Sequence, residues 1–458
     1  MTLRCQLRIT DADYDVLHRH LFPGDGDEHG AVLKAGLCRN GDSVRLLVRE
    51  VALATEGSDY VPGTLGYRAL HPSFIHRHIT ACRDERLVYL AVHNHDTDLS
   101  VRFSHIDLAS HQRGYPALRD IVRGMPVGAL VLGHRSMQAD LWMPDGTRLA
   151  LDEAVVIGSD FTRIYPKPRN SGRKIAESFS RQVQMFGSAG QALLTNCTVG
   201  VIGVGGIGSL VAEYLARLGV GNLIVVDPDE IEETNLSRVV GATAVDVQQK
   251  RSKVAIASRH LDEACPRPHV EAIKGDIAQA AVAAQLRFCD YLVLAADSMR
   301  ARLVFNAMVH QYLIPGVQLG AKVSSSTEGH LVDAFSVNRA VRPGEGCLWC
   351  NGLIDPTRIA IESKTEEQRK AEAYGTEEAN PSVITLNAIA AAHATNDFLF
   401  YFLGLRNGSE LRYEHYHFVQ QSAKRVIPRR DADCRECGRD RSSRFGKGDA
   451  IPLPCING

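Results

Sequence analysis

Thr198-Val-Gly-Val-Ile-Gly203-Val-Gly205-Gly206-Ile-Gly208 is the stretch that decides the fold of most of this chain. Its β-branched run Val199–Ile202 predicts a strand, and its glycines then follow in G-x-G-x-x-G spacing. Helical spacing over Ser209–Leu218 leads to a second apolar run, which ends in Leu223-Ile-Val-Val-Asp227. We predict a βαβ nucleotide-binding unit in which the glycines let the backbone approach phosphates at a helix N-terminus and Asp227 meets a ribose hydroxyl.

The composition is that of a globular chain without a strong charge preference. The chain has 458 residues, 45% hydrophobic and 23% charged, a size that predicts about two to three domains. A formal net charge of -1 gives no electrostatic argument for nucleic acid or a membrane surface. No run reaches the roughly 20 apolar residues of a membrane span, and the first residues do not resemble a signal peptide. We therefore expect a cytoplasmic protein with neither nucleic-acid nor membrane partners.

Residues 1–165 predict a separate α+β domain. Ile9–Phe22 has the pattern of a helix with Thr10 or Asp11 as N-cap, and strand-like runs follow at Ala31–Cys38, Val44–Val51 and Leu87–Val92. The last run leads directly into His93-Asn94-His95, and a carboxylate follows in Ser104-His-Ile-Asp107. Two histidines on alternate residues and one carboxylate form the three-ligand set of a catalytic zinc site with an open fourth position.

This pattern resembles the JAMM (JAB/MPN) metalloprotease family, which removes ubiquitin-like proteins and has a Glu, then His-x-His, then Ser-x-x-Asp. The resemblance implies that His93, His95 and Asp107 hold zinc, that Ser104 stabilises an oxyanion, and that Glu28 is the general base. The sequence departs from the family at Asp96, where proline is usual, and by one extra residue between His95 and Ser104. The alternative is a catalytically dead domain that serves as a binding platform.

Two other histidine positions are not expected to hold metal. His76-Arg-His78 lies in a segment with helical character, and His105 is expected at the surface or behind the metal ligands. Residues 166–178 follow the first domain with the proline, glycine and basic composition of a solvated linker.

A second set of motifs follows the linker in a fixed order. The set comprises Phe179-Ser-Arg181-Gln182, the glycine loop, Asp227-x-Asp229, Asn235-Leu-Ser-Arg238, Lys253 and Ala296-Asp297-Ser-x-x-x-Arg302. Residues 179–405 thereby resemble the ThiF/MoeB-type adenylyltransferase domain shared by ubiquitin-activating enzymes and bacterial sulfur-carrier activators. The glycine loop alone would also fit an NAD dehydrogenase, but the later motifs favour adenylation.

The resemblance implies a role for each of these residues. Gly203, Gly205, Gly206 and Gly208 would cradle the phosphates of ATP while Asp227 holds the ribose, and Asp229 would also belong to the nucleotide-binding residues. Arg238 and Lys253 would neutralise phosphate charge, Asn235 would orient a phosphate or Arg238, and Asp297 would hold Mg²⁺. Arg181 would reach across a homodimer into the partner's ATP site.

Two C-x-x-C pairs indicate a structural zinc site. Of the eleven cysteines, Cys347 and Cys350 form one pair and Cys434 and Cys437 form the other. Four thiolates complete a closed tetrahedral zinc site, which would tie residues 406–458 to the preceding domain. Three of the other cysteines, Cys197, Cys265 and Cys289, are expected in the core or at helix ends.

The segment between the two pairs lacks a cysteine, although relatives that form a thioester commonly place theirs there. Asp355–Glu378 is highly charged, with helical character over Ile359–Lys370, and Pro381 is expected to start a core helix. Either the enzyme hands an acyl-adenylate to another protein's nucleophile, or a cysteine elsewhere serves, with Cys455 in the tail as the candidate.

The sequence thus predicts an α/β protein with a Rossmann-like adenylation domain after an α+β JAB/MPN-like domain. Its predicted function is ATP-dependent adenylation of a ubiquitin-like (β-grasp) carrier, with zinc-dependent processing of that carrier by the N-terminal domain. A conjugating enzyme is a further candidate partner. The alternative is activation of a sulfur-carrier protein for cofactor or natural-product synthesis.

Overall fold

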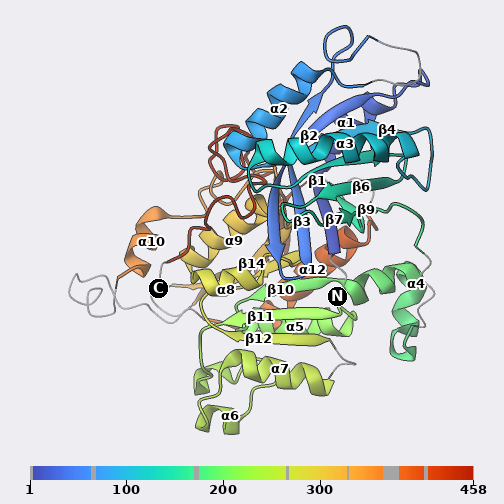
Figure 1. The fold of residues 1–458 in the computed structure, drawn as a ribbon. Coiled ribbons are helices and arrows are strands. Elements are labelled where there is room, and N and C mark those ends of the chain that lie inside the picture. The colour runs from blue at the N-terminus through green and yellow to red at the C-terminus, as the bar shows by residue number, and fades with distance from the viewer. Residues whose placement is uncertain are drawn as a thin grey trace. The chain divides into compact units, whose positions relative to one another are not determined.

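The chain divides into two compact units in the computed structural model (Figure 1). The first unit comprises Met1–Asn170, Gln311–Leu313 and Arg444–Pro452, and the second comprises the rest. The structure describes residues 4–62, 69–169, 175–264, 268–326, 330–364, 381–406 and 411–456. Among these residues, no helix combines the length and apolar composition needed to cross a bilayer.

The first unit is built on a mixed nine-stranded sheet with the order β7-β6-β5-β4-β2-β3-β1-β8-β9. Its elements are β1 (Arg4–Thr10), α1 (Asp11–Leu21), β2 (Gly30–Asn40), β3 (Ser43–Leu53), α2 (Pro72–Glu85), β4 (Val88–Asn94), α3 (His105–Val122), β5 (Val127–Leu132), β6 (Met137–Trp142), β7 (Arg148–Ala150), β8 (Glu153–Ile157) and β9 (Phe161–Ile164).

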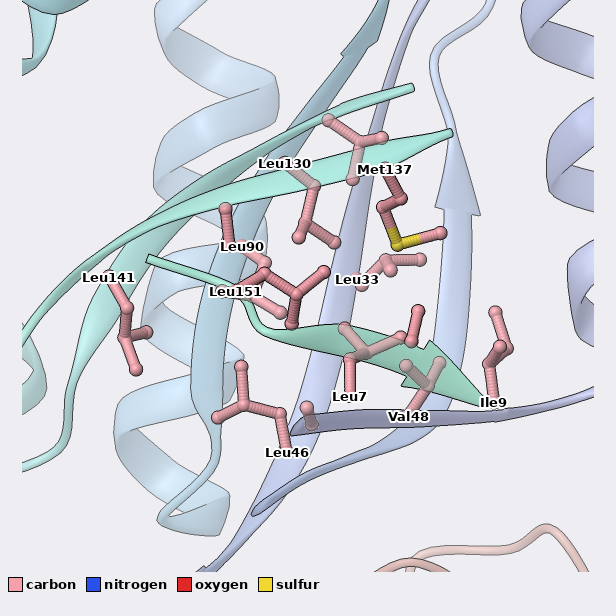
Figure 2. Close-up of a cluster of buried hydrophobic side chains, with 14 of the residues drawn as sticks. Leu7, Ile9, Leu33, Leu46, Val48, Leu90, Leu130, Met137, Leu141 and Leu151 are labelled. Carbon is pink, nitrogen blue, oxygen red and sulfur yellow. The ribbon is translucent and has the colours of Figure 1, made fainter. Parts of the chain in front are cut away.

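Alternation along the strands gives this sheet two apolar faces, because successive side chains of a strand point to opposite sides. Leu33 and Leu90 belong to one buried cluster, which Figure 2 shows together with Leu7 and Leu130. Leu17 and Leu21 of α1 cover that face. The second cluster contains the neighbouring residues Val32 and Tyr89, and α2 and α3 cover it with Phe74, Ile79 and Tyr115.

The predicted elements of this unit are confirmed, with adjusted bounds. The first helix begins after Thr10, whose hydroxyl accepts from the Asp13 amide at 3.3 Å, so Thr10 is the N-cap and Asp11 is not. The three predicted strands correspond to β2, β3 and β4, and the His76-Arg-His78 segment lies on α2. Strand β1, which the sequence did not predict, pairs in parallel with β3 and β8.

The second unit contains an eight-stranded sheet with the order β12-β11-β10-β13-β14-β15-β16-β17. Strands β12 to β14 in this order are parallel, and β15 to β17 are antiparallel. Its strands are β10 (Thr198–Ile202), β11 (Asn222–Asp227), β12 (His269–Lys274), β13 (Tyr291–Leu294), β14 (Gly316–Ser325), β15 (Leu331–Val341), β16 (Tyr413–His417) and β17 (Ser422–Val426).

Helices connect the parallel strands of this sheet and flank it (Figure 1). They are η1 (Glu177–Phe179), α4 (Ser180–Asn196), α5 (Gly206–Arg217), η2 (Glu233–Asn235), α6 (Ala244–Gln248), α7 (Lys253–Ala264), α8 (Ala280–Gln285), α9 (Met299–Gln311), α10 (Pro356–Glu362) and α12 (Ile384–Phe402). The βαβ unit predicted from the glycine stretch is β10-α5-β11, and β10 and β11 pair in parallel.

Two predicted helix bounds in this unit are wrong. Helix α10 begins at Pro356, three residues before the predicted start at Ile359, because the Asp355 carboxylate caps it there. It ends at Glu362, and residues 365–370 of the predicted helical stretch lie outside the described residues. Helix α12 begins at Ile384, so Pro381 precedes the helix rather than starting it. Residues 365–380 lie outside the described residues, as does Cys265, whereas Cys197 and Cys289 are buried as expected.

Residues 444–452, from near the end of the chain, are part of the first unit and lie along β2. The Asp449 amide donates to Leu37 O at 2.8 Å, and the Arg39 amide donates to the Asp449 carboxylate at 2.9 Å. A Cβ on Gly36 would lie 2.0 Å from Gly446 O, so only glycine allows this approach. The boundaries predicted from the sequence stay predictions, and the structure adds this C-terminal segment to the first unit.

This contact predicts that Gly36→Ala destabilises the first unit by about 1–3 kcal/mol, because a methyl group would overlap a backbone carbonyl. Gly114→Ala is the matched control, since a Cβ there meets nothing within 4 Å and a helical alanine gains up to about 1 kcal/mol over glycine. Thermal unfolding of both variants measures the difference. Equal unfolding temperatures would show that residues 444–452 do not support β2.

Candidate functional site

The glycine loop of the second unit has the close approaches that the sequence predicts. Gly203 has φ 89°, and a Cβ there would lie 2.7 Å from the Ala296 amide nitrogen. A Cβ on Gly208 would lie 1.8 Å from Gly203 O. Helix α5 therefore starts directly behind the loop at Gly206, and its N-terminal amides face the carboxyl edge of the parallel strands.

Asp227, the last residue of β11, supports this loop directly. One carboxylate oxygen accepts from the Val204 amide at 2.6 Å, and the other accepts from the Asp229 amide at 2.9 Å. Burial raises the pKa of Asp227, and the two backbone amides act in the opposite direction. The carboxylate thus fixes the backbone on both sides of the sheet edge where a ribose is expected.

Lys253 lies beside the same edge, at the start of α7. Its Nζ is 2.7 Å from the Asp229 carboxylate, and the Lys253 side chain is 13% exposed whereas that of Asp229 is 60% exposed. Because most of the Asp229 side chain stays exposed, its carboxylate is accessible at this edge and lies beside the largely buried Lys253 ammonium group.

Arg238 and Asn235 approach the glycine loop from η2 and the turn that follows it. Asn235, the last residue of η2, is buried, and its side chain accepts from the amide of the N-cap residue Glu232 at 3.2 Å. The Arg238 guanidinium donates to Thr234 O at 2.5 Å, and its Cδ lies 3.1 Å from the position of a Cβ on Gly206. Asn235 therefore fixes the backbone that carries Arg238.

Asn387 of α12 also lies over Gly206, and the sequence did not single it out. Its Nδ2 is 2.5 Å from where a Cβ on Gly206 would stand, and it donates to the Ser382 hydroxyl at 3.1 Å. The only signal in the sequence is an amide in a helix that is otherwise rich in alanine and other apolar residues.

Asp297 follows β13, the strand beside β10, and its side chain is exposed at the same sheet edge. Helix α9 begins two residues later, and the Glu362 carboxylate accepts from the Met299 and Arg300 amides at 2.9 and 3.1 Å. Glu362 was not predicted either. As an anionic cap, Glu362 ties α10 to the N-terminus of α9, which follows Asp297 by two residues.

Arg181 was predicted to act at a nucleotide site, and no contact among the described residues brings it to this edge. It is exposed on α4, and among the described residues no hydrogen bond or ion pair joins it to the glycine loop. Its role toward a partner subunit stays a prediction.

The four cysteines of the C-x-x-C pairs converge, although the pairs lie far apart in the sequence. The Sγ atoms of Cys347 and Cys350 are 3.5 Å apart, those of Cys347 and Cys434 are 3.8 Å apart, and those of Cys350 and Cys437 are 3.5 Å apart. Tetrahedral zinc with bonds of about 2.3 Å requires sulfur atoms about 3.8 Å apart. The geometry fits a closed zinc site.

In the first unit, His93, His95 and Asp107 form a second cluster that could hold a metal ion. The Nε2 atoms of His93 and His95 each lie 3.6 Å from Asp107 Oδ2. His93 Nε2 is buried without a hydrogen-bond partner, which is costly for a polar atom unless another ligand satisfies it. A buried nitrogen without a hydrogen bond, together with this donor set, fits zinc.

The two positions at which the sequence departs from the expected JAMM pattern, Asp96 and the extra residue between His95 and Ser104, do not move these candidate ligands apart. The residues after His95 form an irregular loop that is fixed to the next turn, with the His134 amide donating to Thr97 O at 2.7 Å. Asp96, in the position of the usual proline, lies 3.1 Å from the His134 ring. The loop accommodates the extra residue before α3 begins.

Ser104 and Glu28 border this cluster. Ser104 is the N-cap of α3, and its hydroxyl accepts from the Asp107 amide at 3.1 Å while its own amide donates to Asp107 Oδ2 at 2.7 Å. Glu28 Oε1 lies 3.7 Å from His95 Nε2. Burial raises the pKa of Glu28 and the two histidines lower it less, so a carboxylate with raised basicity faces the cluster. His105 is exposed, at the start of α3.

The parallel sheet, its glycine loop and the acidic and basic groups at its carboxyl edge define a Rossmann-like nucleotide-binding protein. Residues 179–436 match the model of the ThiF family. Because that match covers more than half of the sequence, the chain belongs to the ThiF family.

Curated relatives match parts of this chain. Sulfur carrier protein ThiS adenylyltransferase of Bacillus subtilis (strain 168) is 30% identical over 185 residues, 40% of this chain and 51% of the relative. The SAMP-activating enzyme E1 of Haloferax volcanii is 34% identical over 133 residues, 28% of this chain and 48% of the relative. A tRNA threonylcarbamoyladenosine dehydratase of Bacillus subtilis (strain 168) is 41% identical over 96 residues, 21% of this chain and 37% of the relative.

The chain thus spans about half or less of the length of these relatives. Among solved structures, E. coli MccB with ATP is similar with a TM-score of 0.46 and 23% identity, covering 58% of this chain and 76% of that chain.

The cysteine geometry predicts that the double variant Cys347→Ser/Cys434→Ser holds one zinc ion fewer per chain than the parent, because serine is a poor zinc ligand. Elemental analysis of purified protein measures this. Cys455→Ser is the matched control and keeps the parent's zinc content. An unchanged zinc content in the double variant would contradict the four-cysteine site.

Proposed function

We propose that the second unit catalyses ATP-dependent adenylation of the C-terminal carboxylate of a ubiquitin-like (β-grasp) carrier protein. The observation that carries this proposal is the match of residues 179–436 to the ThiF family, with the glycine loop, Asp227, Lys253 and Asp297 at one sheet edge. Several relatives are named as adenylyltransferases or activating enzymes of sulfur carriers and ubiquitin-like modifiers.

In the proposed reaction a carboxylate oxygen of the carrier attacks the α-phosphorus of ATP. The bond from the α-phosphorus to the bridging oxygen breaks, and pyrophosphate leaves with both electrons of that bond. Negative charge accumulates on the phosphates, so the chain's contribution is to position the reactants and neutralise charge. No proton has to be removed, which fits a site that offers cations and amides.

The residues at the sheet edge divide these tasks. The amides of the glycine loop and the α5 N-terminus would bind phosphate oxygens, and Asp227 would accept from a ribose hydroxyl. Arg238 and Lys253 would balance the phosphate charge. Asp297 would hold Mg²⁺, which supplies further charge neutralisation when bound. A homodimer with Arg181 acting across it belongs to the same proposal.

The fate of the adenylate follows from the cysteine distribution. No cysteine occurs between Cys350 and Cys434. We propose that the acyl-adenylate passes to a nucleophile of another protein, and a conjugating enzyme or a sulfur donor could supply that nucleophile. A thiocarboxylate made on the carrier with a sulfur donor would identify sulfur-carrier activation, whereas an amide-linked product would identify conjugation.

The adenylation proposal predicts that Lys253→Ala slows carrier-dependent exchange of pyrophosphate into ATP by about 100-fold or more, because a preorganised cation is lost from the phosphates. Lys274→Ala is the matched control, since Lys274 also forms an ion pair near this edge, with Glu230 at 2.8 Å. It should exchange within about twofold of the parent. Equal rates in the two variants would contradict the proposed role of Lys253.

A second activity is proposed for the first unit, zinc-dependent hydrolysis of the bond that follows a carrier's C-terminus. The observation that favours it is the cluster of His93, His95 and Asp107, in which His93 Nε2 is buried without a hydrogen bond. Zinc, when bound, supplies a Lewis acid that activates water at neutral pH. Glu28 would accept and return a proton, and the Ser104 hydroxyl would donate to the developing oxyanion.

This proposal predicts that Glu28→Gln keeps its zinc but hydrolyses a linear fusion of carrier and reporter protein about 100-fold more slowly, because the proton acceptor is lost. His95→Ala should lose both the zinc and the hydrolysis. Zinc analysis and gel assays of the same samples measure the two effects. A parent protein without zinc beyond the cysteine site would instead favour the binding-platform alternative.

A further inference from the structure

Asn94 stands between the two histidines of the N-terminal cluster, and its side chain has no role in the hydrolysis proposed above. It is the last residue of β4 and is 5% exposed. Because side chains alternate along a strand, Asn94 points away from the face that carries His93 and His95. The strand thus presents the predicted ligands on one side and a buried amide on the other.

The amide of Asn94 is bound to the backbone on both sides of Glu28. The His29 amide donates to Asn94 Oδ1 at 2.6 Å, and Asn94 Nδ2 donates to Asp27 O at 3.4 Å. Only one orientation of the amide satisfies both contacts, since an N–H needs an acceptor and a carbonyl needs a donor. The peptide units flanking Glu28 are therefore held by one side chain.

Regular secondary structure does not hold this segment. The β2–β4 ladder ends with the pair Gly30 and His93, and residues 27–29 lie outside any helix or strand. Beyond the end of the ladder, the Asn94 side chain supplies the hydrogen bonds to this backbone. The next residue, Gly30, is also fixed from the side, because its amide donates to the Tyr60 hydroxyl at 2.9 Å and its carbonyl lies 3.0 Å from the His20 ring.

We propose that Asn94 is the positioning residue of the N-terminal site, holding Glu28 so that its carboxylate faces the metal-ligating side chains. The proposal rests on the proposed hydrolysis. Glu28 Oε1 lies 3.7 Å from His95 Nε2, on a backbone fixed at Asp27 and His29. The His-Asn-His triplet then carries two ligands and the support of the general base on consecutive residues.

The test compares Asn94→Ala with Asn40→Ala in the full-length zinc-loaded protein. Asn40 is an exposed asparagine at the C-terminal end of β2, whereas Glu28 precedes the start of that strand. Hydrogen exchange of the His29 amide, zinc per chain, and kcat and KM on the linear carrier fusion are measured together. For Asn94→Ala we expect exchange at His29 to be about tenfold faster or more, because the hydrogen bond of the His29 amide to the Asn94 side chain is lost. Zinc content and KM should stay at parent values while kcat falls about tenfold or more.

Asn94→Asp provides the conservative rescue. Its carboxylate keeps an acceptor for the His29 amide, so exchange at His29 should stay within about threefold of the parent. Asn40→Ala should leave all readouts unchanged.

Three results with Asn94→Ala, and one with the parent protein, would overturn the proposal. Unchanged exchange at His29 in Asn94→Ala would show that the amide does not hold the segment. Loss of zinc in Asn94→Ala would make Asn94 a support of the ligands instead of the base. Faster exchange with an unchanged kcat would show that the fixed backbone does not serve Glu28. A parent that binds zinc without cleaving the fusion would refute the proposed hydrolysis and with it a role for Asn94 in catalysis, even where the exchange data show that Asn94 holds the segment.

Discussion

The proposed adenylation site depends on the two hydrogen bonds that the Asp227 carboxylate accepts from backbone amides. The carboxylate binds the Val204 amide in the glycine loop and the Asp229 amide beyond β11, so two separate turns are fixed by one side chain. Burial disfavours its charge and raises its pKa, and the two amides offset only part of that cost. The turn that ends in Asp229 then carries the partner of Lys253, 2.7 Å away. Asp227, which is expected to bind ribose, thus also fixes the glycine loop and the turn that carries Asp229.

The two units illustrate the same physical rule in different ways. In each, chemistry-bearing side chains lie where a strand ends, because backbone groups that leave a ladder there are free to bind ligands or side chains. In the second unit the parallel strands bring several turns to one edge. In the first unit a single strand end supplies His93 and His95, and the first turn of α3 supplies Asp107.

The sequence predicted those parts of the protein in which neighbouring residues cooperate. The glycine loop, the C-x-x-C pairs and the His-x-His triplet are local patterns, and the βαβ unit and the two ligand clusters follow from them. Asn387 and Glu362 were missed because their partners lie far away in the sequence. Residues 444–452 were missed as part of the first unit for the same reason. The roles of the individual site residues remain predictions, because a side chain's position alone does not establish what it binds.

The most direct test of the proposed activity is mass spectrometry of a β-grasp carrier incubated with the protein, ATP and Mg²⁺ and quenched in acid. The account predicts that the carrier gains the mass of one AMP at its C-terminus and that pyrophosphate is released. Blocking the carrier's C-terminal carboxylate as an amide should abolish both. An unmodified carrier together with release of inorganic phosphate alone would contradict attack at the α-phosphorus and with it the proposed function.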